Sequence, residues 1–112
     1  IIGTPVYMGG VSGQLKLLFD RMYGFTGPDR ENRIPAGKKA IVAVTQAASQ
    51  ERHKAVAEDA RIFLSRRGLE TRIIRGCGMK TADPVIQFSD ELRKEAEELG
   101  KWLASPAKAD SF

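Results

Sequence analysis

One stretch of the sequence decides the fold class: Lys39-Ala40-Ile41-Val42-Ala43-Val44-Thr45. It is apolar without alternation, which is typical of a strand buried on both faces, as the strands of parallel sheets are. Two shorter runs, at residues 1–4 and 71–75, contain isoleucine and threonine and are expected to form two further strands. The sequence therefore predicts a sheet of three strands.

Three further segments place their apolar residues on one helical face. The first two cover residues 12–23 and 50–66, and the third follows Ser89. In the first segment the expected buried stripe consists of Val11, Leu15, Leu18, Phe19 and Met22. Serine residues stand where each helix is expected to begin and can cap it: Ser12, Ser49 and Ser89. Gly24 and Gly68 are expected to end the first two helices.

The predicted order of elements is β, α, β, α, β, α. A helix in each crossover predicts a parallel sheet with right-handed connections. The expected fold class is therefore α/β, a doubly wound parallel sheet with three strands and three helices. Between the first helix and residue 38, the segment 25–37 contains Gly27-Pro28-Asp29 and few apolar residues, so we expect a surface loop long enough to carry a function.

Composition excludes several classes of protein. The chain has 112 residues, of which 42% are hydrophobic and 29% are charged, as in soluble globular domains rather than disordered or membrane-spanning chains. No apolar run approaches the roughly 20 residues of a spanning helix, so no membrane partner is expected. One cysteine and one histidine cannot form a zinc or iron–sulfur site, and we expect no metal and a cytoplasmic location.

The net charge of +4 is compatible with attraction of nucleic acid or of a phosphorylated ligand. No aromatic residues alternate with the arginines of the second half of the chain as a platform for stacked bases requires. We therefore expect a solvated basic face and no nucleic-acid partner. The arginines concerned are Arg61, Arg66, Arg67, Arg72 and Arg75.

The chain opens on Ile1-Ile2-Gly3-Thr4, without a methionine and inside a predicted strand. Doubly wound sheets usually have five or more strands, and nothing earlier in the sequence pairs with the other edge of this strand. We expect residues 1–105 to be the C-terminal part of a larger domain and residues 106–112 to be a frayed tail. Another chain or an N-terminal half is expected to pair with the first strand.

The candidate site follows the first strand. In open α/β sheets ligands bind at the carboxyl ends of the strands. The segment Thr4-Pro5-Val6-Tyr7-Met8-Gly9-Gly10 lies at such an end and leads into a helix. Its backbone N–H groups can bond a flat heteroaromatic ring, while Tyr7 and Met8 cover the apolar edge of that ring.

This segment and the residues that follow it resemble the third strand and the following helix of the NADPH-dependent FMN reductase family. The residues that follow are Val11-Ser12-Gly13-Gln14-Leu15-Lys16 and Phe19-Asp20-Arg21. That family has a flavodoxin-like fold and includes iron–sulfur flavoproteins and quinone and azo reductases. The resemblance implies that this chain supplies the third to fifth β–α units and that FMN and NAD(P)H are its cofactors. It implies FMN contacts from Thr4, Pro5, Val6, Tyr7, Met8, Gly9 and Gly10, and from Thr45, Gln46 and Ala47 after the next strand.

The resemblance also implies an activity. Hydride passes from NAD(P)H to the flavin and on to a quinone, an azo compound, free flavin or an electron-acceptor protein, in a dimer or tetramer. The cofactor carries this chemistry, so no catalytic residue is named. In that family the FMN phosphate binds at the first strand-to-helix turn, which would precede Ile1, and we expect this chain alone to bind FMN weakly.

Two other functions stay open. The chain can be a non-catalytic flavodoxin-like binding or assembly module without bound flavin, or a binder of phosphate or nucleic acid, which rests on the charge of +4 alone. Cys77 is expected to be a small buried hydrophobic residue and His53 a surface residue.

Overall fold

The computed structural model describes residues 1–79 and 89–106. The predicted loop around Asp83 and Pro84, and all but the first residue of the predicted tail, lie outside the described residues. The elements are β1 (Ile2–Pro5), α1 (Gly13–Arg21), a 3-10 turn η1 (Met22–Phe25), β2 (Lys39–Thr45), α2 (Lys54–Arg66), β3 (Glu70–Gly76) and α4 (Asp90–Ala104).

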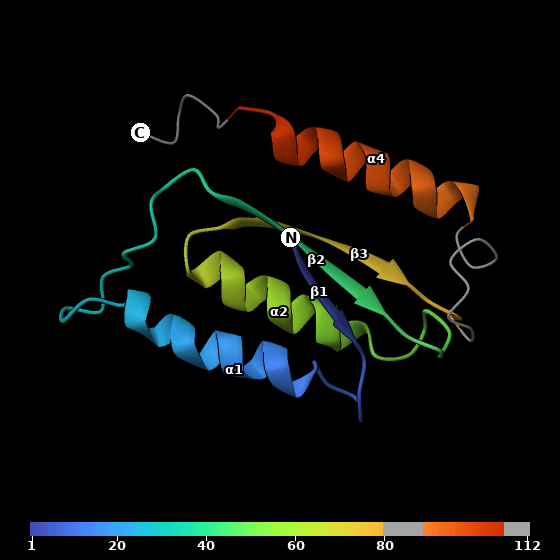
Figure 1. Cartoon of the computed structure of the whole chain (residues 1–112), viewed down its shortest axis with the longest axis horizontal. Coiled ribbons are helices and arrows are strands. Elements are labelled where there is room, and N and C mark those ends of the chain that lie inside the picture. Colours follow the sequence, from blue (N-terminus) through green and yellow to red (C-terminus); the bar gives the residue numbers. More distant parts are fainter. Residues whose placement is uncertain (80–88, 107–112) are drawn as a thin grey trace.

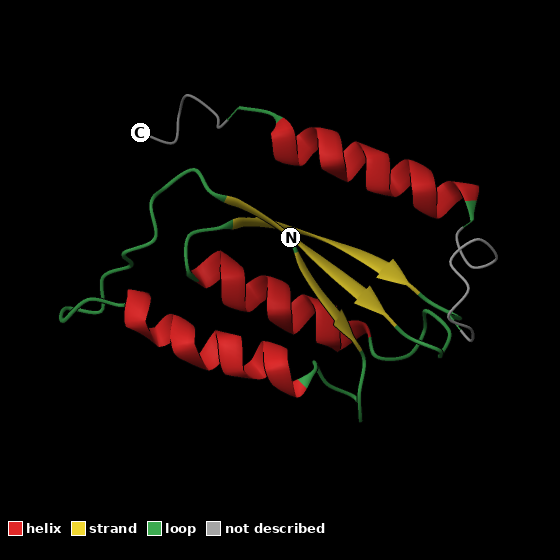
Figure 2. Cartoon of the chain, in the orientation of Figure 1, coloured by secondary structure: helices red, strands yellow, loops and turns green. Residues whose placement is uncertain are grey.

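The three strands form one parallel sheet in the order β1-β2-β3. Figure 1 shows α1 and α2 on one face of this sheet and α4 on the other, and Figure 2 shows in yellow the strands that lie between these two layers of helices. The α/β prediction is confirmed, and the arrangement is that of part of a flavodoxin-like fold. Among the described residues, nothing pairs with the edge of β1 that faces away from β2.

The core lies between the sheet and the helices α1 and α2. β2 supplies Ala40, Val42 and Val44, and both valines are almost completely buried. The helices supply the other buried members of this cluster, which are Leu15, Phe19, Ala57, Ala60 and Leu64. The rings of Phe19 and Phe63 pack with their centroids 4.5 Å apart and so join α1 to α2.

The expected apolar stripe of α1 is confirmed except at Leu18. α1 contacts the core through Leu15 and Phe19, with Met22 packed against it from η1. Leu18 lies beside this face and is 47% exposed, so its prediction as a core residue is wrong. The helix also ends at Arg21, and a 3-10 turn carries the chain past Gly24 to Phe25.

Two of the three predicted helix caps are confirmed. The Ser12 side chain accepts a hydrogen bond from the Leu15 N–H at 3.2 Å, and the Ser89 side chain accepts one from Leu92 at the same distance. The prediction for Ser49 is wrong, because α2 begins at Lys54 and its N-cap residue His53 has a φ of +60° and no capping side-chain bond.

On the other face of the sheet, α4 carries the buried Leu99 and also makes polar and aromatic contacts with the strands. Lys39 Nζ donates to the carbonyls of Trp102 at 2.8 Å and Ser105 at 2.7 Å. The Arg72 guanidinium lies over the Trp102 ring, 4.3 Å from its centroid. Within the segments that the structure describes, no helix is long and apolar enough to cross a membrane.

The first prediction concerns the core. We expect Leu64→Ala to lower the free energy of unfolding by about 3 kcal/mol, because the side chain is fully buried and the cavity cannot close completely. The matched control Leu17→Ala removes the same atoms from an exposed position on α1 and should change it by no more than about 0.5 kcal/mol. Urea denaturation of both variants measures the difference, and equal losses would contradict the assigned core.

Candidate functional site

The carboxyl ends of the three parallel strands meet at one edge of the sheet. The loops at residues 6–12, 46–53 and 77–79 follow β1, β2 and β3 there, at the arrowheads in Figure 1. The Val6 N–H donates to the Thr45 carbonyl at 2.9 Å, and the Gln46 N–H donates to the Gly76 carbonyl at 2.9 Å. These bonds continue the strand pairing by one residue beyond β1 and β2, and they fix the position at which each loop begins.

Residues 7–10 form a tight turn that projects from this edge. Tyr7 and Gly10 exchange two backbone hydrogen bonds, of 2.9 and 2.8 Å, and the two residues between them have positive φ angles, +48° at Met8 and +75° at Gly9. Positive φ at both central positions is the feature of type I′ hairpin turns. The turn leaves the Tyr7 side chain 62% exposed and the Met8 side chain fully exposed.

The residues before this turn hold it in place. Thr4 is buried, and its Oγ1 accepts a hydrogen bond from the Ser12 N–H and donates one to the Pro5 carbonyl, both at 2.9 Å. Val6 packs against the core. The hydroxyl of Thr4 is thus used inside the protein, where it ties the end of β1 to the start of α1.

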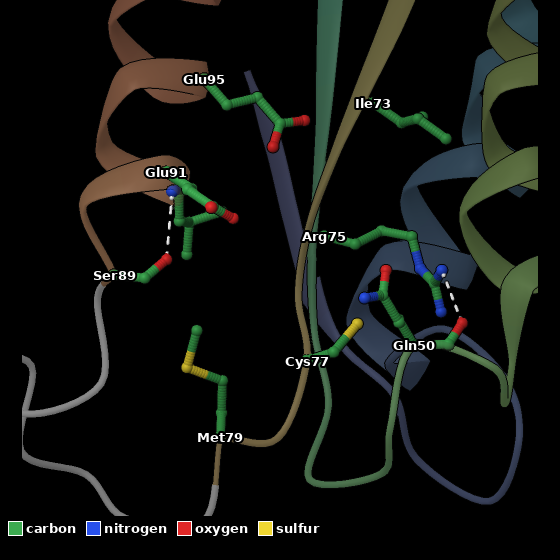
Figure 3. Close-up of a pocket in the computed structure, with 9 residues that line it drawn as sticks. Gln50, Ile73, Arg75, Cys77, Met79, Ser89, Glu91 and Glu95 are labelled. Atoms are coloured by element: carbon green, nitrogen blue, oxygen red, sulfur yellow. Dashed lines mark hydrogen bonds between the residues drawn. The ribbon is translucent and has the colours of Figure 1, made fainter.

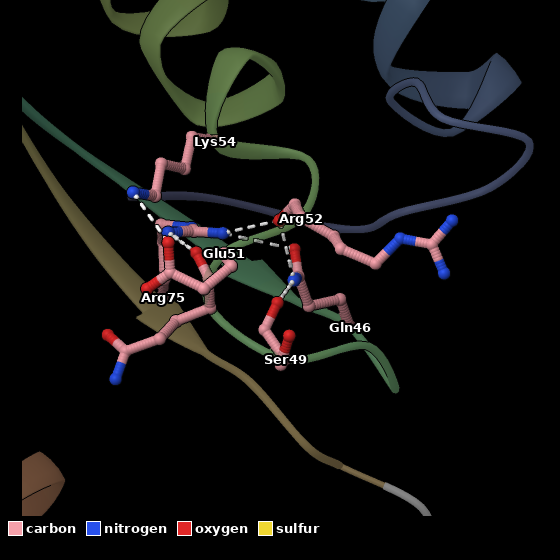
Figure 4. Close-up of polar contacts among 7 residues, drawn as sticks. Gln46, Ser49, Glu51, Arg52, Lys54 and Arg75 are labelled. Carbon is pink, nitrogen blue, oxygen red and sulfur yellow. Dashed lines mark hydrogen bonds and ion pairs between the residues drawn. The ribbon is translucent and has the colours of Figure 1, made fainter.

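Gln46 occupies the equivalent place after β2, and its side chain is turned inward. It is 5% exposed, and its Nε2 donates to the carbonyls of Ala48, Ser49 and Arg52 at 3.3, 2.8 and 2.9 Å (Figure 4). The loop 46–53 therefore wraps around this amide. Like Thr4, Gln46 is buried and holds the backbone of the loop in place by its hydrogen bonds.

Arg75, near the end of β3, holds the same loop from the other side. Its guanidinium donates to the Gln50 carbonyl at 3.1 Å and to the Arg52 carbonyl at 2.9 Å, and it contacts Gln46 Oε1 at 3.4 Å. These contacts direct the loop carbonyls toward Gln46 and Arg75 rather than along a helix axis. This explains why α2 does not begin at Ser49.

Sequence reasoning missed this role of Arg75. The expectation of one solvated face is wrong for three of the five arginines, which are only partly exposed: Arg61, Arg67 and Arg75. Arg75 Nε is buried and has no partner within the described part of the chain. The position of Arg75 in the strand could have indicated this role. Arg75 pairs with Val44 in the sheet, so its side chain lies on the face of the sheet where α2 begins. Elsewhere on α2, Arg61 hydrogen bonds to Glu58 and lowers the pKa of that carboxyl.

The predicted site residues thus divide into two groups. Thr4 and Gln46 are buried, and Pro5 and Val6 are partly buried, so these four fix the two loops. An exposed group remains at the same edge and consists of Tyr7, Met8, Gly9, Thr45 and Ala47, with Gly10 partly exposed. The two loops approach each other at His53, whose Nδ1 lies 4.0 Å from the position that a Cβ on Gly9 would take.

A pocket of about 500 Å³ adjoins this edge between β3 and α4. Its lining includes Cys77 and Met79, and Figure 3 shows Glu91 and Glu95 directed from α4 toward β3. Cys77 is half-buried, more accessible than expected for a buried hydrophobic residue. Within residues 1–79 and 89–106, no three acidic, histidine or cysteine side chains come together as metal ligands.

The sequence model of the NADPH-dependent FMN reductase family matches residues 1–83, which include the turn at residues 7–10 and the loop 46–53. The chain belongs to the NADPH-dependent FMN reductase family. No curated protein matches it significantly. Members of the FMN reductase family are oxidoreductases that depend on FMN and NADPH, and both segments of the candidate site fall within the matched region.

The second prediction concerns the loop around Gln46. We expect Arg75→Met to raise the hydrogen-exchange rates of the amides at residues 47–53 by about tenfold, because the variant loses charge-assisted bonds to two loop carbonyls. The control Arg72→Met removes an arginine of the same strand that lies over Trp102, and should leave these amides unchanged. Mass spectrometry of exchanged peptides gives both rates. Unchanged exchange in Arg75→Met would show that the loop does not depend on this side chain.

The third prediction concerns the turn. Gly9 has a φ of +75°, which a residue with a Cβ adopts only with strain, so Gly9→Ala should lower the free energy of unfolding by about 1 kcal/mol. Gly10→Ala is the matched control, because Gly10 has no positive φ and a Cβ there would make an ordinary contact of 3.8 Å with the Tyr7 carbonyl. Thermal and denaturant unfolding measure the change in the free energy of unfolding for both variants. If Gly10→Ala lowered the free energy of unfolding as much as Gly9→Ala does, the result would contradict the turn geometry.

Proposed function

We propose that the turn at residues 7–10 and the adjoining loop 46–53 bind the ring system of FMN, and that the protein acts as an FMN-dependent NAD(P)H oxidoreductase. One observation carries the proposal. A strained turn at the carboxyl edge of a parallel sheet presents an exposed aromatic ring and an exposed thioether beside a second, internally braced loop.

The chemistry of the turn fits a flat ring with polar edges. Tyr7 and Met8 offer an aromatic face and a polarizable sulfur, which pack well against a heteroaromatic ring. The Tyr7 and Gly10 N–H groups are used within the turn, whereas those of Met8 and Gly9 have no acceptor among the described residues. Two backbone donors at the tip are thus free for the ring nitrogens and carbonyls of a flavin.

In this proposal the chain positions the cofactor and does not itself perform the chemistry. FMN, when bound, supplies hydride transfer between NAD(P)H and an acceptor. Gln46 and Arg75 hold the loop 46–53 in one shape, and Thr4 fixes the base of the turn. The acceptor classes that we propose are a quinone, an azo compound, free flavin or an electron-acceptor protein.

We also propose that the protein forms a homo-oligomer. Large apolar side chains are exposed on α1 and η1, and exposed apolar groups of this kind often mark protein–protein contacts. They include Leu18 and Phe25.

The fourth prediction tests the ring site with riboflavin, which has the flavin ring but no phosphate. We expect riboflavin to bind to the protein with quenching of its fluorescence, and Tyr7→Ala to weaken binding about tenfold through loss of ring contact. Phe25→Ala is the control, because Phe25 is also an exposed aromatic residue but lies after α1, at the other end of the sheet.

Two outcomes would overturn the proposal. One is the absence of binding at millimolar riboflavin and FMN. The other is equal weakening by Tyr7→Ala and Phe25→Ala, which would place the flavin away from the turn.

A further inference from the structure

A second pocket, of about 720 Å³, lies at the amino edge of the sheet. It is lined by the segment after α1 and by the residue after α2, and its polar lining side chains are Tyr23, Thr26, Arg30, Arg33 and Arg67. The segment is the cyan loop at the left of Figure 1. β2 starts at this end of the sheet and its seven residues span about 20 Å, so the pocket and the turn at residues 7–10 lie at opposite ends of the strands.

The loop that forms this pocket is internally bonded. Thr26 and Asn32 form an antiparallel bridge, the Gly27 N–H donates to the Glu31 carbonyl at 2.8 Å, and the Arg30 N–H donates to the Gly27 carbonyl at 2.9 Å. Gly27 is buried, and a Cβ at this position would collide with the Glu31 side chain. Within the segment 25–37, expected as a surface loop long enough to carry a function, residues 26–32 thus form a compact hairpin with a defined shape.

Arg67 ties this hairpin to the end of α2. Its guanidinium donates to Thr26 Oγ1 at 2.8 Å and lies 5.3 Å from the centroid of the Phe63 ring, while its carbonyl accepts from Asn32 Nδ2. Gly68 allows this approach, because a Cβ there would lie 2.6 Å from Asn32 Nδ2. The charge of Arg67 is therefore held in place before any ligand arrives.

Arg30 adds a second arginine at the cost of backbone strain. Its φ is +61°, a conformation that glycine adopts freely and arginine does not. Strained residues of this kind cluster at functional sites. A use for the charge of Arg30 at the tip of the hairpin would explain why an arginine occupies this conformation.

The charges of the pocket do not balance. Three guanidinium groups, of Arg30, Arg33 and Arg67, line it. The carboxylate that the structure pairs with them is that of Glu31, 3.9 Å from Arg33 Nε and exposed. Guanidinium groups match the geometry of phosphate oxygens, and binding an anion relieves the repulsion between neighbouring arginines.

We infer that this pocket binds a phosphate group, held by Arg30 and Arg33 against the fixed charge of Arg67. The phosphate is either a free inorganic anion or part of an ester. In the second case the organic group lies on the Tyr23 ring, which is 75% exposed at the pocket wall. The inference is independent of flavin binding, since it uses a different edge of the sheet and different residues.

The fifth prediction tests this site by calorimetric titration with inorganic pyrophosphate and with adenosine 5′-diphosphate. We expect Arg30→Gly and Arg33→Gln each to weaken binding of pyrophosphate about tenfold, and Glu31→Gln to strengthen it, because that carboxylate competes with the ligand for Arg33. Arg30→Gly also relieves the positive φ, so loss of binding cannot be attributed to unfolding.

The matched control is Arg66→Gln. Arg66 is an exposed arginine in the last turn of α2, next to Arg67 in sequence but outside the pocket lining. If it weakens pyrophosphate binding as much as Arg33→Gln does, the effect is one of overall charge and the inference is overturned, as it is if neither ligand binds. Tighter binding of the diphosphate ester than of pyrophosphate, lost in Tyr23→Ala, identifies an ester; equal affinities identify a free anion.

Discussion

The rest of the structure depends on the burial of β2 at both of its edges and on both of its faces. β1 and β3 pair with it along its two edges, α1 and α2 cover one face and α4 covers the other. Its register places Val44 opposite Thr4 on one side and Arg75 on the other. Because the three strands are held side by side in this register, their carboxyl ends coincide, and three loops that are distant in sequence reach one edge of the sheet.

Most of the fold could be predicted because its signals are local. The strand at residues 39–45 follows from one apolar run, and the starts of α1 and α4 follow from Ser12 and Ser89, whose capping bonds reach only three residues along the chain. Leu18 shows where local reasoning fails. It fits the helical stripe, but the side of that stripe that faces the sheet depends on how α1 approaches β2, which no spacing of residues determines.

The candidate site could be predicted only in outline. The sequence located both loops by the strands that precede them, but it could not distinguish polar side chains that face a ligand from those that hold the loop. Thr4 and Gln46 belong to the second kind because their partners are backbone groups of the same edge. Arg75 bonds to the carbonyls of Gln50 and Arg52, 25 and 23 positions away in sequence, and these long-range bonds hold the loop outside the helix that begins at Lys54.

Backbone strain marks both ends of the molecule. Within the described residues, the non-glycine residues with positive φ are Met8, Arg30 and His53. Each costs about 1 kcal/mol relative to glycine, and none of the three helps to pack the core. Hydrogen bonds hold each conformation: the Tyr7–Gly10 pair around Met8, the bonds within the hairpin around Arg30, and the bonds from Gln46 and Arg75 to the loop before His53. A glycine would satisfy the same backbone bonds without this strain, so the backbone hydrogen bonds alone do not require a side chain at these positions. Met8 and Arg30 are also the residues whose side chains the proposed flavin and phosphate sites use.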